Sequence, residues 1–170
     1  RERGTWQTQE IASVRHDPPP GRVDDGGLRI TFVNHATFLI QMDGINVLTD
    51  PVWSERASPL PFVGPRRVRP PGISLDDLPR VDLVLITHNH YDHLDTTTLK
   101  RLARRDDPLV VTTMGNKALV GRQGFSRVIE LDWWQETAAA VRVTCVPAQH
   151  FSGRGLFDGY KTLWAGFVLE

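Results

Sequence analysis

The chain has 170 residues, a length that suits one domain with a substantial buried core. Its 20 acidic and 20 basic side chains cancel, so composition gives no reason to expect a nucleic-acid-binding protein. The single cysteine, Cys145, excludes an internal disulfide framework, and no apolar run reaches the length of a membrane span. We expect a buried Cys145 and a cytoplasmic or peripheral-membrane location, with room for a targeting segment ahead of Arg1.

The first part of the chain predicts an arm that is followed by strands. Residues 1–27 are polar and rich in Pro and Gly, which is typical of an arm or linker. From residue 28 to residue 50, alternating apolar residues and the Asp43-Gly44 pair predict an antiparallel meander. Residues 51–80 are rich in Pro and Arg, and we expect a long ordered loop there.

Strands and helices alternate in the rest of the sequence. The apolar run VDLVLIT predicts a central strand that is covered on both faces, and Asp95 is placed to cap a helix over TTTLKRLARR. Further strands are expected in PLVVTT, SRVIEL, AAVRVTCVPA and KTLWAGFVLE, with a short helix in NKALVGRQG. The pattern predicts an α/β or α+β fold, with a mixed sheet and helices packed on it.

Residues 86–95, ITHNHYDHLD, concentrate metal-ligand side chains where the central strand is predicted to end. In extended backbone His88, His90 and Asp92 point the same way, whereas His93 breaks that parity. Neutral imidazole and ionised carboxylate bind zinc and similar divalent ions. The spacing favours two neighbouring metals, one held by His88 and His90 and the other by Asp92 and His93, over a polar loop without metal.

Other ligands must come from elsewhere, because a mononuclear catalytic zinc needs about three protein ligands. His150, in VPAQHFSGRG at the end of another predicted strand, is the best candidate. His35, in VNHATFLI, either supports a ligand through a hydrogen bond or is a core histidine, and the residues leave both interpretations open. His16 lies in the Pro-rich arm and is expected to be solvated.

Six segments in consistent order resemble one known family. They are NHATFLIQMDG, LTDPVWSERASP, GPRRVRPP, ITHNHYDHLD, IELDWW and PAQHFSGRG. They are similar to the metallo-β-lactamase superfamily, in the branch that contains N-acyl-phosphatidylethanolamine-hydrolysing phospholipase D and its bacterial relatives. The resemblance covers roughly residues 28–170. It implies an αββα sandwich, a site for two zinc ions and phosphodiester hydrolysis by a metal-bound hydroxide.

The resemblance also implies roles for single residues. His88, His90 and His150 would bind the first zinc ion. Asp92 and His93 would bind the second and take part in catalysis. Asp50, in LTDP, would support the ligands from behind, a role that His35 could share.

The segment GPRRVRPP offers three arginines, Arg66, Arg67 and Arg69. Guanidinium groups pair well with phosphate, so these side chains could contact the substrate or an anionic lipid surface. A solvated loop without such a role is the alternative.

The family fold has a second half that supplies a bridging aspartate and a last histidine, and the sequence stops before either. We therefore expect a domain over residues 28–170 that is truncated before its C-terminal half. The chain would be a fragment of a longer enzyme, a half completed by self-association or by a second chain, or a non-catalytic metal-binding module. The expected substrate is a small-molecule or lipid phosphodiester, with lactone or other ester hydrolysis as the alternative, and a membrane surface is a candidate partner.

Overall fold

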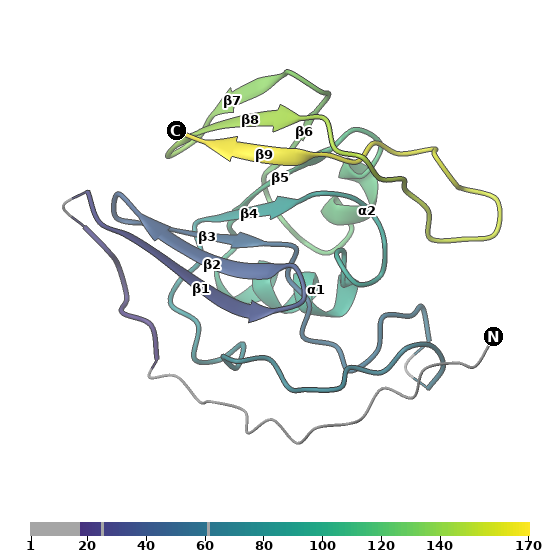
Figure 1. The fold of residues 1–170 in the computed structure, drawn as a ribbon, viewed down its shortest axis with the longest axis horizontal. Coiled ribbons are helices and arrows are strands. Elements are labelled where there is room, and N and C mark those ends of the chain that lie inside the picture. The colour runs from purple at the N-terminus through teal and green to yellow at the C-terminus, as the bar shows by residue number, and fades with distance from the viewer. Residues whose placement is uncertain (1–17, 25, 61) are drawn as a thin grey trace, which may run out of the picture.

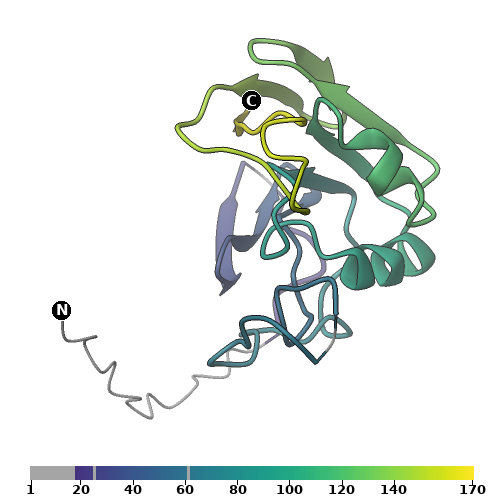
Figure 2. The ribbon, with the colours of Figure 1, turned by 90° about the vertical axis from the view of Figure 1, so that its right-hand side faces the viewer.

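The computed structural model describes residues 18–24, 26–60 and 62–170. The larger sheet contains, in spatial order, β1 (Leu28–Asn34), β2 (Thr37–Met42), β3 (Ile45–Thr49), β4 (Leu83–Ile86), β5 (Leu109–Thr113) and β6 (Val128–Leu131). The smaller sheet contains β7 (Glu136–Ala138), β8 (Arg142–Val146) and β9 (Gly166–Leu169). The helices are α1 (Thr96–Arg105) and α2 (Lys117–Gly121). The smaller sheet lies above the larger one in Figure 1, and Figure 2 shows the helices along the other side.

Two apolar clusters join these layers. One cluster packs the helices on the larger sheet and includes Leu99 and Leu102 of α1 with Val84 of β4. The other lies between the two sheets and includes Leu83 of β4 and Val143 of β8. All four residues of β4 are buried, because the strand is covered on both faces. The predicted mixed sheet with helices packed on it is thus confirmed.

The pairing of the strands places their ends. The β1–β2–β3 segment is an antiparallel meander, as predicted, and β2 and β3 meet through the turn at Asp43 and Gly44, both with positive φ. From β3 to β6 the neighbours run parallel. The carboxyl ends of parallel strands meet at one edge of a sheet, and ligand sites form there.

Helix α1 begins and ends as its sequence predicts. The Asp95 carboxylate accepts hydrogen bonds from the backbone N–H groups of Thr97 and Thr98, which the first helical turn leaves without partners. Arg104 and Arg105 lie in the last turn, where positive charge favours the helix C-terminus.

The C-terminal strands differ from the sequence prediction. The strand expected in AAVRVTCVPA is present as β8, but it forms a hairpin with β7, a strand ahead of that segment that was not predicted. Strand β9 begins only at Gly166, because residues 161–165 turn back towards the larger sheet, where the N–H of Ala165 donates to the carbonyl of Thr87.

The structure describes part of the N-terminal arm. Residues 18–24 have no helix or strand, but they lie against the domain: the side chain of Gln41 donates to the carbonyl of Pro20, and Arg22 pairs with Asp82. His16 and the other residues of 1–17 lie outside the described residues. Within the described part of the chain, no helix is long and apolar enough to cross a membrane.

One apolar face of the larger sheet is open at its β1 edge. Leu28, Ile30 and Phe32 are each more than half exposed. They are paired across the strands with apolar side chains of β2, at Met42, Ile40 and Phe38. Since Ile40 and Met42 pack against the cluster between the sheets, this row lies on the face that the smaller sheet covers further along.

Candidate metal centre

The ends of three strands bring the metal-ligand side chains together. Asp50 follows β3, residues 88–93 follow β4, and His150 follows β8. The N–H of Asp50 donates to the carbonyl of Leu85 at 2.9 Å, which extends the β3–β4 pairing up to the site. In Figure 1 the loop that carries His150 extends beyond the same edge at which β3 and β4 end.

Three histidine nitrogens form the first group of donors. His88 Nε2 lies 2.9 Å from His90 Nδ1 and 3.0 Å from His150 Nε2, and the third side of this triangle measures 3.3 Å. A tetrahedral zinc with bonds of 2.0–2.1 Å places its nitrogen ligands about 3.4 Å apart. The triangle is only slightly smaller than one face of that tetrahedron, so the three side chains fit a divalent ion.

The second group contains His35, Asp92 and His93, whose ligand atoms all lie within 4.8 Å of one another. Asp92 Oδ2 is 2.9 Å from His35 Nε2 and 3.7 Å from His93 Nε2. The two groups adjoin, because the rings of His88 and His93 have centroids 4.1 Å apart. Their side chains thus form a continuous surface of nitrogen and carboxylate donors.

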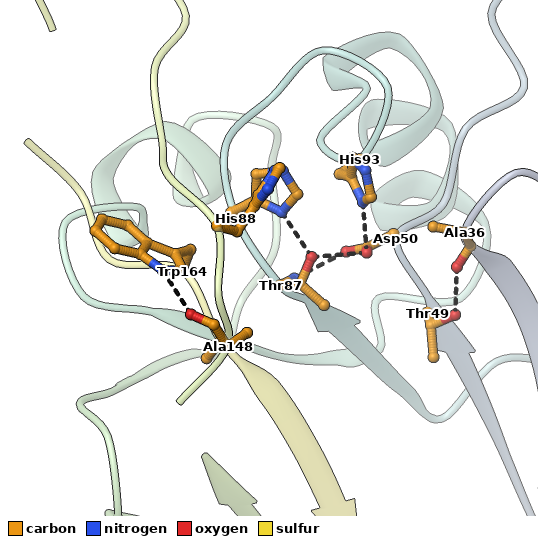
Figure 3. Close-up of a pocket in the computed structure, with 10 residues that line it drawn as sticks. Ala36, Thr49, Asp50, Thr87, His88, His93, Ala148 and Trp164 are labelled. Atoms are coloured by element: carbon orange, nitrogen blue, oxygen red, sulfur yellow. Dashed lines mark hydrogen bonds and ion pairs between the residues drawn. The ribbon is translucent and has the colours of Figure 1, made fainter. Parts of the chain in front are cut away.

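Asp50 lies behind both groups and is almost fully buried. Its Oδ2 is 2.8 Å from His93 Nδ1 and 2.8 Å from the hydroxyl of Thr87, while its Oδ1 accepts the backbone N–H of Thr87. The same hydroxyl lies 2.8 Å from Nδ1 of His88 (Figure 3). Asp50 thereby reaches a histidine of each group.

The backbone at two of these residues is unusual. His35, in the turn between β1 and β2, has φ +44°, and Asp50 has φ +35°. Left-handed backbone is uncommon outside glycine, although Asp and His tolerate it better than most residues. Such conformations cluster at functional sites, where the surrounding structure holds them.

Burial and charge shift the proton affinities of the histidines. Burial, followed by the neighbouring histidines, lowers the pKa of His88 to about 3. Burial also lowers the pKa of His90, with His150 as the next cause. Burial acts in the same direction on His93, but the hydrogen bond and charge of Asp50 outweigh it and raise that pKa. At neutral pH His88 and His90 are therefore uncharged and free to bind a cation.

The carboxylate of the second group stays ionised. Burial raises the pKa of Asp92, but the positive charge of His93 and the hydrogen bonds from its own backbone and from His35 lower it by more. An anionic oxygen beside the neutral imidazoles of the first group suits a divalent cation.

A pocket of about 470 Å³ opens beside the two groups. Its lining comes from Thr49 of β3 and from segments that adjoin strands of both sheets. Figure 3 draws the ten residues that line it: Ala36, Thr49, Asp50, Thr87, His88, His93, Ala148, His150, Trp164 and Ala165. The indole N–H of Trp164 donates to the carbonyl of Ala148, which fixes the wall next to His150.

The three arginines of the long loop have different surroundings. Arg66 donates to the carboxylate of Glu55, and Arg67 donates to the backbone carbonyls of Val52 and Ser54. Arg69 is exposed. The first two guanidinium groups thus bind their own loop in the structure, and their contact with substrate stays a prediction.

Three residues near the site were not found by sequence reasoning. Thr87 precedes the histidine cluster, Asn89 lies inside it, and Arg154 follows His150 by four positions. The Asn89 side chain accepts the N–H of Gly153, and Arg154 donates to the carbonyls of Asn89 and Leu94. Thr87 and Asn89 could have been found from their positions next to ligand residues. Arg154 has no such signal in the sequence.

A helix–sheet–sheet fold with two adjoining His/Asp groups at its strand ends is the architecture of metallo-hydrolases. The family model described as "Beta-lactamase superfamily domain" matches residues 45–170, so the chain belongs to that family, in which metal-dependent hydrolases are found. Within the metallo-β-lactamase superfamily it lies in the branch that resembles N-acyl-phosphatidylethanolamine-hydrolysing phospholipase D.

Comparisons with single proteins support this placement. The chain is 36% identical over 156 residues to N-acyl-phosphatidylethanolamine-hydrolyzing phospholipase D 1 of Caenorhabditis elegans, an alignment that covers 85% of the chain and 44% of that protein. It is 25% identical to isothiocyanate hydrolase from Delia radicum gut bacteria, with a TM-score of 0.61. That match covers 83% of this chain and 57% of the hydrolase chain.

A second solved structure, CmlA, a diiron β-hydroxylase from Streptomyces venezuelae, is also 25% identical, with a TM-score of 0.61 and coverage of 91% of this chain and 28% of that chain. The chain spans less than half the length of the curated relatives it matches.

Proposed function

We propose that the two donor groups form the metal centre of a zinc-dependent hydrolase that cleaves phosphodiester bonds. The main support for this proposal is the contact between the two donor groups. The ring of His88, in the first group, and the ring of His93, in the second group, have centroids 4.1 Å apart. Two-metal hydrolytic sites need ligand sets this close, because their ions lie about 3.5–4 Å apart.

Each group has a distinct part in this proposal. His88, His90 and His150 would hold one ion, and Asp92 and His93 would hold the other, with His35 contacting the Asp92 carboxylate. Bound divalent ions lower the pKa of a coordinated water and neutralise charge that develops on phosphate oxygens. The protein residues orient the ligand atoms, and Asp50 supports them from the buried side.

The proposed substrate class is a lipid phosphodiester, taken from the name of the Caenorhabditis elegans relative. Two loops that begin at residues of the site, Asp50 and His150, expose apolar side chains that suit such a substrate or a membrane surface. Leu60 and Phe62 lie on the loop after β3, and Leu156 and Phe157 lie on the loop after His150. We propose peripheral contact of these loops with the lipid surface.

Zinc is the proposed metal because three imidazoles and a carboxylate suit it, but the same donors also bind iron. The structural relative CmlA is a diiron enzyme. Elemental analysis after expression in medium with equal zinc and iron distinguishes the two metals, and we expect zinc in excess.

The complete enzyme would use further ligands. The relatives are longer than this chain, and we propose that a bridging aspartate and a last histidine come from a C-terminal half or from a partner chain. The alternative is a non-catalytic module that holds metal through the same two groups.

Metal content and turnover separate these functions. We would measure metal per chain and hydrolysis of bis(p-nitrophenyl) phosphate for the unaltered protein and for His88→Ala, Asp92→Ala and the control Asp76→Ala, which changes an exposed carboxylate on the long loop. Two ions with turnover that only the first two variants lose would support the hydrolase and would show that this chain completes its own site. Metal without turnover would mean that the further ligands are required or that the chain is a non-catalytic module, and no metal would contradict both functions.

A further inference from the structure

Thr87 connects the buried carboxylate of Asp50 to the first donor group. Its hydroxyl oxygen is 2.8 Å from Asp50 Oδ2 and 2.8 Å from His88 Nδ1, and its backbone N–H donates to Asp50 Oδ1 (Figure 3). Asp50 Oδ2 is also 2.8 Å from His93 Nδ1. Two histidines from different donor groups therefore depend on one carboxylate, one of them directly and the other through a hydroxyl.

The protons in this chain of contacts can be assigned. A carboxylate only accepts hydrogen bonds, whereas a hydroxyl has one proton to donate. Since the Thr87 hydroxyl is 2.8 Å from Asp50 Oδ2, its proton must lie between those two oxygens. Nδ1 of His88 then donates its own proton to Thr87, and Nδ1 of His93 donates to Asp50.

In a neutral ring, a proton on Nδ1 leaves Nε2 bare and free to bind metal. In both rings Nε2 is the atom that faces the donor groups: His88 Nε2 lies in the nitrogen triangle, and His93 Nε2 faces Asp92 Oδ2. With the opposite tautomer His88 would turn an N–H towards the triangle, and no metal could bind that nitrogen. The tautomer of a metal-binding histidine is commonly set by such a partner at its other nitrogen.

We infer that Thr87 is a positioning residue, whose hydroxyl transmits the hold of Asp50 to His88 so that one carboxylate orients a histidine in each metal-binding group. The inference rests on the proposed metal centre, but its first prediction concerns the metal-free protein. No other side chain can replace Thr87 in this role, because His88 Nδ1 has no side-chain hydrogen-bond partner in the described part of the chain other than the Thr87 hydroxyl.

Two substitutions isolate the hydroxyl. Thr87→Val removes it while keeping a similar β-branched shape, and Thr87→Ser keeps it while removing a methyl group. In the metal-free protein, ¹⁵N NMR of the histidine side chains reports the tautomer of each ring. We expect the Nδ1–H form for His88 in the unaltered protein and in Thr87→Ser, and loss of that preference in Thr87→Val, with His93 unchanged.

Zinc affinity gives the second readout. Competition with a chelator should show roughly 10–100-fold weaker binding at the first group in Thr87→Val, the usual cost of losing the partner of a metal-binding histidine, and parent-like binding in Thr87→Ser. An Nε2–H tautomer of His88 in the unaltered protein would overturn the inference without any variant. Equal zinc affinity of Thr87→Val and the parent would also overturn it, whereas failure of the unaltered protein to bind zinc would contradict the proposed function instead.

Discussion

Arg154 joins the two loops that carry the candidate ligands. Its guanidinium donates to the backbone carbonyls of Asn89 at 2.8 Å and Leu94 at 2.7 Å, and it lies 3.9 Å over the ring of Tyr91. Burial lowers the pKa of Arg154, although Tyr91 and two carboxylates oppose that shift. Asn89, inside the histidine cluster, and Leu94, directly after His93, are thereby held against the segment that follows His150.

Replacing Arg154 should loosen this connection. Arg154→Ala would leave two carbonyls without a charged donor, and we expect a loss of about 1–3 kcal/mol in the free energy of unfolding, together with weaker metal binding through His150. Urea unfolding and chelator competition measure the two effects. The control, Arg101→Ala, breaks an exposed ion pair with Asp76 and should change stability by less than about 1 kcal/mol. Equal effects of both variants would contradict the role of Arg154.

Cys145 is buried between the two sheets, and burial raises the pKa of its thiol to about 11. About one thiol in a thousand is then ionised at pH 8, and only the thiolate reacts. We expect the folded protein to react with a disulfide reagent at least a hundred times more slowly than the urea-unfolded protein. Fast reaction of the folded protein would show that Cys145 is accessible.

The raised pKa of the Cys145 thiol also makes the stability of the protein depend on pH. Because the folded state keeps this proton more tightly than the unfolded state, Cys145 contributes stability that is present below pH 9 and is lost as the pH rises through about 11. Cys145→Ala should flatten the alkaline fall in the melting temperature over that range.

At the scale of elements, α1 and the long loop after β3 meet at one carboxylate. Asp95 caps the helix, and it also accepts hydrogen bonds from the backbone N–H and the hydroxyl of Ser54 at 2.9 and 2.8 Å. Arg67 then donates to the carbonyl of Ser54. The predicted long ordered loop owes part of its order to this connection, which lies directly after the histidine cluster.

Loss of the Asp95 carboxylate should therefore cost more than an ordinary helix cap. Asp95→Ala removes the cap and the contact with Ser54, and we expect a loss of about 2–4 kcal/mol, compared with about 1 kcal/mol for a typical cap. The control, Ser54→Ala, removes one of these hydrogen bonds and should cost about 1 kcal/mol. Unfolding in urea measures both. A loss of only about 1 kcal/mol for Asp95→Ala, with no loss for Ser54→Ala, would show that the carboxylate acts as a cap alone.

The elements could be predicted where one local pattern decides the structure. Alternation indicated the β1–β2–β3 meander, the apolar run indicated β4, and Asp95 indicated the start of α1. Strand β7 was missed because its three residues, Glu-Thr-Ala, carry no apolar alternation and pair only with β8. The contacts of Thr87 and Arg154 were missed because they join residues that are 37 and about 60 positions apart.

At the scale of the whole molecule, the sequence predicts a metal centre because most of its donors lie close together in the chain. His88, His90, Asp92 and His93 all fall within residues 88–93, and only His35 and His150 come from elsewhere. His150 was proposed from its place at a strand end, and the structure brings its Nε2 to 3.0 Å from His88 Nε2. For His35, the sequence allows either a core residue or a support of a ligand. The fold places it 2.9 Å from Asp92, which no sequence pattern encodes, because the contact spans 57 positions.

The open face at β1 predicts how the whole chain behaves in solution. Leu28, Ile30 and Phe32 form an apolar row on an edge strand, and an exposed apolar edge favours association of copies. Full burial of one such side chain contributes roughly 1.5–3 kcal/mol. We therefore expect self-association in the micromolar range, weakened at least tenfold when both Ile30 and Phe32 are replaced by Lys.

Sedimentation velocity over a range of protein concentrations measures this association. The control is Val68→Lys, which places the same charge on another exposed apolar residue, in the long loop. If association follows the open face, the double variant shifts to monomer while the control keeps the parent behaviour. Equal behaviour of the parent and both variants would mean that the row on β1 does not bind a second copy, and association would then have to be sought on the apolar loops beside the metal centre.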